Sequence, residues 1–117
     1  MRHHGVHHVS INVDDVDTNR AFYMEVLGFE PIDRPDLGIG GAWLQMGPQE
    51  LHLVELPMPS GVGPHFALQV DDIEEASSEL CGKGVDVSAI GDIPNVCRQA
   101  FFNDPAGNQI ELNQRLG

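Results

Sequence analysis

The sequence predicts an α+β fold of two βαβββ modules, and three observations support this. The stretch His8-Val-Ser-Ile-Asn-Val-Asp-Asp-Val-Asp recurs, with conservative changes, as His65-Phe-Ala-Leu-Gln-Val-Asp-Asp-Ile-Glu, 65 − 8 = 57 residues later. Leu51-His52-Leu53 recurs as Ile110-Glu111-Leu112, 111 − 52 = 59 residues later. Each copy also shows the pattern of one strand, one helix and three further strands. Internal similarity of this kind indicates a duplicated structural unit.

The first copy begins with a half-buried strand, because polar and apolar residues alternate over residues 7–13. Asp14 and Asp15 then supply N-cap chemistry for a helix over about residues 16–27, and Gly28 ends it. Strong β-formers between glycine-rich turns predict three short strands, near Phe29–Asp33, Trp43–Met46 and Glu50–Leu56.

The second copy follows a segment rich in proline and glycine, residues 57–64, which we interpret as a linker. A strand over 65–70 precedes a helix over about 73–83, which Gly84 ends. Three strands are expected near Asp86–Ala89, Arg98–Asn103 and Gln109–Asn113. The chain is therefore expected to be a single domain over residues 1–117, with module 6–56 and module 65–114 joined by linker 57–64.

Composition excludes several classes of function. The chain of 117 residues carries 18 acidic and 6 basic residues, a formal net charge of −12, which disfavours nucleic acids and anionic membranes as partners. Neither Cys81 nor Cys97 belongs to a metal or disulfide motif, so both are expected to be reduced thiols in a cytoplasmic protein. No secretory signal and no apolar run of about 18 residues occurs, so no membrane span is expected.

Alternation also predicts which side chains are available for chemistry. Apolar residues of the first strand of each copy occupy the face toward the helix, so His8 and His65 are expected on the opposite face. The last strand of each copy places His52 and Glu111 on that same face. If the two sheets close toward each other, these side chains share one polar cavity. A single histidine on a strand is more often structural than a ligand, but these histidines recur at equivalent positions beside a carboxylate.

The same parity predicts the lining of a substrate pocket. Six side chains are expected there: Trp43, Gln45, Glu50, Gln69, Gln99 and Phe101. Trp43 and Phe101 are equally well explained as ordinary core residues. Arg98 has the opposite parity, so a strongly anionic substrate finds no evident clamp, and a small carbonyl or diol compound is the better match. Glu55 is expected at the surface, and the terminal histidines His3, His4 and His7 are not counted as ligands.

Four motifs together resemble the vicinal oxygen chelate superfamily, which includes glyoxalase I, methylmalonyl-CoA epimerase, fosfomycin-resistance proteins, bleomycin-resistance proteins and extradiol dioxygenases. They are His8 through Asp15, Ala21 through Phe29, His65 through Asp72, and Phe102-Asn-Asp-Pro-Ala-Gly-Asn-Gln-Ile-Glu-Leu112. The resemblance implies paired βαβββ modules forming a cupped eight-stranded mixed sheet around a divalent metal ion. It also implies that the metal ligands are His8, His52, His65 and Glu111. Imidazole and carboxylate ligands suit Ni, Mn, Fe or Zn.

This resemblance leaves the function open between three classes. The first is a glyoxalase-like lyase or isomerase acting on a small carbonyl compound or its thiol adduct, with Glu111 as ligand and base. The second is a binding or sequestration protein of the bleomycin-resistance kind, in which metal is absent or incidental. The third is a small non-haem dioxygenase, since His8, His65 and Glu111 resemble a facial triad. Similar proteins carry glutamate or glutamine where this chain has His52, and they commonly form homodimers, some with exchanged modules.

Overall fold

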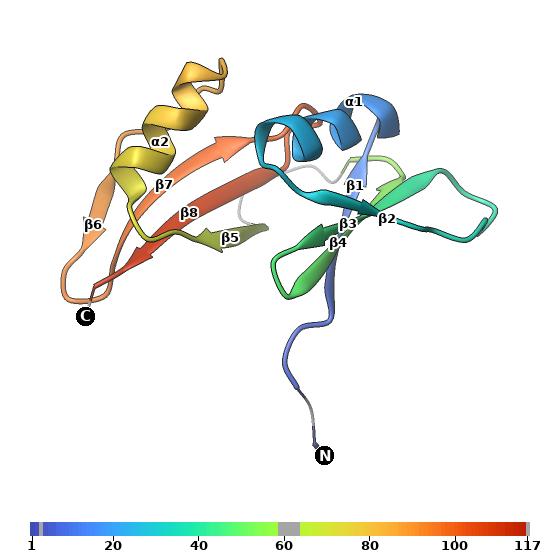
Figure 1. Ribbon diagram of the computed structural model, residues 1–117, viewed down its shortest axis with the longest axis horizontal. Coiled ribbons are helices and arrows are strands. Elements are labelled where there is room, and N and C mark those ends of the chain that lie inside the picture. The colour runs from blue at the N-terminus through green and yellow to red at the C-terminus, as the bar shows by residue number, and fades with distance from the viewer. Residues whose placement is uncertain (3, 59–63, 117) are drawn as a thin grey trace. The chain divides into compact units, whose positions relative to one another are not determined.

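The computed structural model describes residues 1–2, 4–58 and 64–116, and the chain divides into two compact units, Met1–Gly61 and Val62–Gly117. Residues 59–63 of the predicted linker 57–64 lie outside the described part of the chain. Each unit contains one four-stranded mixed sheet with a helix packed against it (Figure 1).

The first unit contains the elements that the first sequence copy predicts. They are β1 (His8–Val13), α1 (Val16–Ala21), η1 (Phe22–Val26), β2 (Glu30–Ile32), β3 (Gly41–Met46) and β4 (Gln49–Glu55). The strand order is β1-β4-β3-β2, in which β1 runs parallel to β4 and the other neighbours are antiparallel. The side chain of Asp15 accepts a hydrogen bond from Thr18 N, which confirms Asp15 as the predicted N-cap.

The predicted helix over residues 16–27 is present but changes character partway. It is α-helical to Ala21 and continues over Phe22–Val26 as a wider π-helical turn. The helix ends where Gly28 adopts a φ of +75°, a conformation that a glycine reaches without strain. Tyr23, inside the π-helical turn, is fully buried and stacks on Phe29 with ring centroids 5.7 Å apart.

The second unit repeats the order of the first. It contains β5 (His65–Gln69), α2 (Ile73–Gly82), β6 (Gly91–Ile93), β7 (Cys97–Asn103) and β8 (Gln109–Arg115), with strand order β5-β8-β7-β6. As in the first unit, the first strand runs parallel to the last, here β5 to β8, and the other neighbouring pairs are antiparallel. Figure 1 shows α2 lying against β7 and β8. The predicted α+β class and the βαβββ order of both modules are confirmed.

One predicted strand is wrong. The segment Asp86–Ala89 is not a strand, and the first strand after α2 is β6, at Gly91–Ile93. The reason lies at Ser88, whose N–H donates to Phe101 O at 2.8 Å while Phe101 N donates to Ser88 Oγ at 2.8 Å. The segment thus runs beside β7, but a side-chain hydroxyl takes the place of a backbone carbonyl, so no regular ladder forms.

Each core lies between the helix and the sheet of its own unit. In the first unit the largest fully buried side chains include Tyr23, Leu44, Leu51 and Leu53, and in the second they are Ile73 and Ile110. The alternating burial of β3 and β4 follows the predicted parity, and the more polar face of each sheet is turned away from its helix. Among residues 1–2, 4–58 and 64–116, no helix has the length and apolar character that crossing a membrane requires.

Candidate functional site

Three neighbouring strands of the first unit bring their polar side chains to one face. In the strand register, His8 on β1 lies opposite Glu50 on β4, and Trp43 on β3 lies opposite His52 on β4. Because side chains that oppose each other in register share a face of the sheet, these four side chains lie together. The face carries two imidazoles, one carboxylate and one indole.

The aromatic rings on this face form a continuous stack. The imidazoles of His8 and His52 lie with centroids 4.0 Å apart and planes inclined by 12°. The indole of Trp43 lies against His52 with centroids 4.4 Å apart and planes inclined by 11°. His52 therefore sits between two nearly parallel rings, and its side chain is only 12 % exposed. His8 is the exposed outer member of the stack.

Glu50 forms the charged contact of this group. Its Oε1 lies 2.9 Å from His52 Nε2, and its side chain is 26 % exposed. The hydrogen bond from His52 is the main cause that lowers the pKa of the Glu50 carboxyl below its ordinary value, although burial works in the opposite direction. The nearby imidazoles of His7, His52 and His8 add smaller effects that also lower this pKa. The carboxylate form of Glu50 is thereby favoured.

The second unit presents the pair His65 and Glu111. His65 Nε2 lies 3.2 Å from Glu111 Oε1, and the two side chains are 37 % and 10 % exposed. The other carboxylate oxygen, Oε2, accepts a hydrogen bond of 2.7 Å from Asn113 Nδ2. Phe101, opposite Glu111 in the register, meets the His65 ring edge-on with centroids 6.0 Å apart. The carboxylate of Glu111 is therefore held in one orientation.

The second-unit pair has the spacing that two ligands of one cation require. Ligand atoms about 2.0–2.2 Å from a zinc-like ion, at tetrahedral or octahedral angles, are about 3.0–3.5 Å apart. The 3.2 Å between His65 Nε2 and Glu111 Oε1 falls in this range. A carboxylate ligand that also accepts a hydrogen bond, as Glu111 does from Asn113, is typical of metal sites. Among the described side chains of either unit, no group of three His, Cys, Asp or Glu residues lies close enough together to hold a metal ion.

The glutamines predicted to line a substrate pocket differ in whether their side chains are free to contact a ligand. The Gln45 amide donates to Gly47 O at 2.8 Å and Gln49 O at 3.1 Å, so it holds the β3–β4 turn. Gln99 lies opposite Asn113 in the β7–β8 register, on the face of Glu111. Gln69, at the end of β5, is exposed. Asn113 shares this face, and its contact with Glu111 gives it a role that the residue pattern does not indicate.

Arg98 lies apart from these pairs, as the sequence predicts, whereas His7 of the terminal histidines contacts His8. Arg98 bonds to Asp92 at 3.1 Å and to Glu74 of α2 at 3.2 Å, on the helix side of its sheet. These hydrogen bonds raise the pKa of the Arg98 guanidinium, and the one that it donates to Asp92 has the largest effect. His7 Nδ1 lies 2.9 Å from His8 Nδ1, His4 is exposed, and His3 lies outside the described residues.

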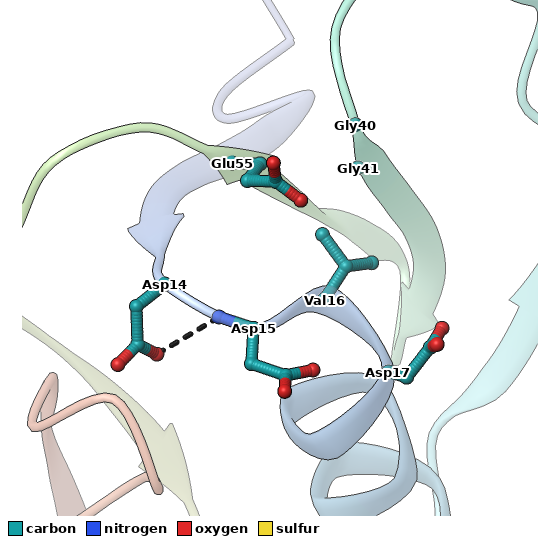
Figure 2. A pocket seen from close by; sticks show the side chains of 7 residues that line it. All are labelled: Asp14, Asp15, Val16, Asp17, Gly40, Gly41 and Glu55. Carbon is teal, nitrogen blue, oxygen red and sulfur yellow. Dashed lines mark hydrogen bonds between the residues drawn. The ribbon is translucent and has the colours of Figure 1, made fainter.

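A separate pocket of about 500 Å³ lies at the start of α1, on the helix side of the first sheet. Figure 2 shows its lining, which consists of Asp14, Asp15, Val16, Asp17, Gly40, Gly41 and Glu55. A pocket of about 410 Å³ occurs at the equivalent position at the start of α2. Asp14 and Asp15 serve the turn into the helix, since Asp15 N donates to Asp14 Oδ1 at 2.9 Å. Glu55 is exposed, as predicted.

Comparisons with known proteins agree with this architecture. Glyoxylase I 4 of Arabidopsis thaliana is 34% identical over an alignment of 119 positions. The alignment covers 92% of this chain and 68% of that protein. The crystal structure of a protein from Bacillus anthracis, described as of the glyoxalase family, superposes with a TM-score of 0.86 at 30% identity, covering 99% of this chain and 100% of that one. TnmS3, an antibiotic binding protein from Streptomyces sp. CB03234, superposes with a TM-score of 0.82 at 34% identity, covering 99% of both chains.

The family model of the Glyoxalase/Bleomycin resistance protein/Dioxygenase superfamily matches residues 5–112, which include both βαβββ modules. The resemblance that the sequence motifs indicate is therefore confirmed. The chain belongs to the Glyoxalase/Bleomycin resistance protein/Dioxygenase superfamily.

Proposed function

We propose that the protein is a metal-dependent lyase or isomerase that acts on a small carbonyl compound or its thiol adduct. The observation that carries this proposal is the His65–Glu111 pair, whose facing donor atoms are 3.2 Å apart. The similarity to Glyoxylase I 4 supports the same reaction class.

The proposed ligands are His65 and Glu111 of the second module. His8 and His52, which the family resemblance implies as further ligands, stay predictions. Imidazole and carboxylate donors suit Ni, Mn, Fe or Zn. When bound, such a cation supplies Lewis-acid polarisation of a substrate carbonyl.

The chain itself supplies the proton transfer. Glu111 takes the proton from the hydroxyl-bearing carbon beside the carbonyl and returns it to the carbonyl carbon. The hydroxyl proton passes to the former carbonyl oxygen, so that the isomerisation is balanced in atoms and charge. Asn113 holds Oε2 of this carboxylate during both transfers. Because the Glu111 residue is only 7% exposed, few water molecules compete for its proton.

Two measurements on untagged protein test this proposal. Elemental analysis after incubation with Ni, Mn, Fe or Zn should show bound cation, and the loaded protein should turn over thiohemiacetals or acyl-CoA epimers. Catechols are assayed beside them. Glu111→Gln should abolish turnover. Glu55→Gln, which changes an exposed glutamate of β4 on the opposite face, should leave turnover unchanged.

Protein that binds no cation and gains no thermal stability from any of the four would contradict the proposal. Turnover of catechols alone would favour a dioxygenase.

A binding function is the second candidate, and the ring stack of Trp43, His52 and His8 favours it. Stacked rings provide a flat surface for a planar ligand. TnmS3, a relative that covers the whole chain, is an antibiotic binding protein. This candidate predicts tight binding of a planar aromatic compound by metal-free protein, with loss on Trp43→Leu. Binding that requires the cation would instead support the enzyme proposal.

A further inference from the structure

Arg34 follows β2 and lies beside the first residue of β3. Within the first sheet, Ile32 of β2 lies opposite Trp43 of β3. Two residues farther along the chain, Arg34 reaches Gly41, because its Nη2 and Cζ atoms are 2.8 and 2.9 Å from the point that a β-carbon at residue 41 would occupy. The guanidinium therefore takes the space that any other residue at this position would fill with its own side chain.

This contact places the guanidinium on the face of the first sheet that carries the ring stack. Side chains two residues apart along a strand share a face, so Gly41 and Trp43 present the same face of β3. The burial pattern agrees, since Ala42 and Leu44, which alternate with them, are buried against the helix side. Residues two apart are separated by about 7 Å along a strand. Arg34 thus brings a positive charge next to the indole end of the stack.

The hydrogen-bond donors of Arg34 are only partly used. Nη2 donates to Ile39 O at 2.9 Å, and this is the one hydrogen bond of the side chain in the described part of the chain. Nε is buried and meets no acceptor among the described residues. Nη1 makes no hydrogen bond to them either, and it keeps access to solvent. At least one N–H group of a cation is therefore available to a ligand.

The acidic residues of the chain leave this cation unpaired. The chain carries 18 of them, yet no carboxylate of the described residues forms an ion pair with Arg34. Asp36, close in sequence, instead accepts a hydrogen bond of 2.9 Å from Gly38 N through Oδ1 and so holds its own turn. A half-buried arginine without a carboxylate, in a chain so rich in them, differs from Arg98, which contacts both Asp92 and Glu74.

A buried N–H without an acceptor is uncommon and calls for an explanation. The planar guanidinium matches the two oxygens of a carboxylate, and hydrogen bonds between such charged groups are strong. We propose that Arg34 is an anion subsite, which takes the carboxylate of a small aromatic ligand whose ring lies at Trp43. Strand parity excludes Arg98 from this role, and it makes no prediction for Arg34, which lies just beyond the strand expected near Phe29–Asp33.

The subsite makes the ligand of the proposed function more specific, from a small carbonyl compound to one that also carries a carboxylate. It rests on the proposed function only for this ligand class, because neither Arg34 nor Trp43 is a proposed metal ligand. Anion binding can therefore be measured on metal-free protein.

Two probes that differ in charge test the subsite. Chelator-treated protein of all 117 residues is titrated with 3-phenylpropionate and with the neutral 3-phenylpropanamide. Trp43 is the one tryptophan of the chain, so its fluorescence reports a ligand at the ring stack. We expect the carboxylate to bind at least about 10-fold more tightly than the amide, the usual effect of a hydrogen bond to a charged group. Equal affinities, or unchanged fluorescence with both probes, would overturn the inference.

Matched variants show whether the guanidinium is responsible. In Arg34→Gln the two probes should bind alike, and Arg34→Lys, which keeps the charge, should retain part of the preference for the carboxylate. Arg20→Gln, which removes an exposed arginine of α1, should keep the whole preference. Circular dichroism and thermal unfolding check that each variant is folded. If Arg34 only holds Ile39 O, Arg34→Gln lowers stability but leaves the preference unchanged, and the subsite is refuted.

One further measurement needs no variant. In protein labelled with nitrogen-15, the Arg34 Nε–H resonance should shift on addition of 3-phenylpropionate and stay in place with the amide, and the same response to both would contradict the subsite. The outcomes also separate the subsite from the proposed function. If the protein binds no cation but prefers the carboxylate through Arg34, only the metal-dependent function fails. If it binds a cation and shows no preference, only the subsite fails.

Discussion

Among single residues, Asn113 has the most specific effect on the proposed metal centre. Its amide donates to Glu111 Oε2 at 2.7 Å and so fixes the carboxylate that faces His65. Asn113→Ala removes this donor, and cation affinity should fall by about 10–100-fold without loss of the fold. Chelator competition on the folded variant measures this change. An affinity equal to that of wild type would show that Asn113 does not position Glu111.

Trp43 should contribute to stability through its contact with His52. The rings are nearly parallel, with centroids 4.4 Å apart. Trp43→Leu removes the stacking, which should lower the free energy of unfolding by about 0.5–1.5 kcal/mol beyond the loss of apolar area. Trp43→Phe, which keeps a ring at this position, should recover much of that energy. Urea unfolding of both variants makes the comparison, and equal destabilisation by leucine and phenylalanine would contradict a stacking role.

Individual elements depend on side chains from other strands, as α2 shows. The N-terminal residue of this helix, Ile73, donates its backbone N–H to Gln114 Oε1 of β8 at 2.8 Å, while Asp72 accepts from Glu75 N as the N-cap. Ile73 is fully buried, so its N–H has no access to water if Gln114 is removed.

Gln114→Met should therefore destabilise the second unit by about 1–3 kcal/mol, the usual effect of leaving a buried donor unsatisfied. Urea unfolding measures the loss, and faster hydrogen exchange at the Ile73 amide locates it. Exchange at Ile73 that stays as slow as in wild type would contradict a capping role for Gln114.

The elements also show where sequence reasoning succeeds and fails. Within the described part of the chain, alternation and glycine punctuation locate both helices and seven of the eight strands, because these signals are local. The strand predicted near Asp86–Ala89 is absent because the Ser88 hydroxyl bonds to Phe101 N, a contact between residues far apart in sequence. The π-helical turn at Phe22–Val26 has no local signal in the pattern either.

In the whole molecule, the repeat predicts which polar residues share a face but not how their rings are oriented. Parity places His8, His52 and Glu50 together, and the register confirms this placement. The sequence gives no information that His8 and His52 stack, or that Glu50 contacts His52, because side-chain torsions depend on packing against Trp43. These side-chain contacts are therefore known only from the structure.

We also propose, on the family resemblance alone, that the protein forms a homodimer. Light scattering coupled to size-exclusion chromatography should give twice the chain mass at micromolar concentration. A single-chain mass across the whole concentration range would contradict this prediction.

The metal content of untagged wild-type protein tests the central claim most directly. Protein incubated with each of Ni, Mn, Fe and Zn and then freed of excess ion should retain one equivalent of at least one of them per site. The double variant His65→Ala/Glu111→Gln should retain none, and Glu55→Gln should retain as much as wild type. Wild-type protein without bound cation, or a double variant that retains as much as wild type, would contradict the account.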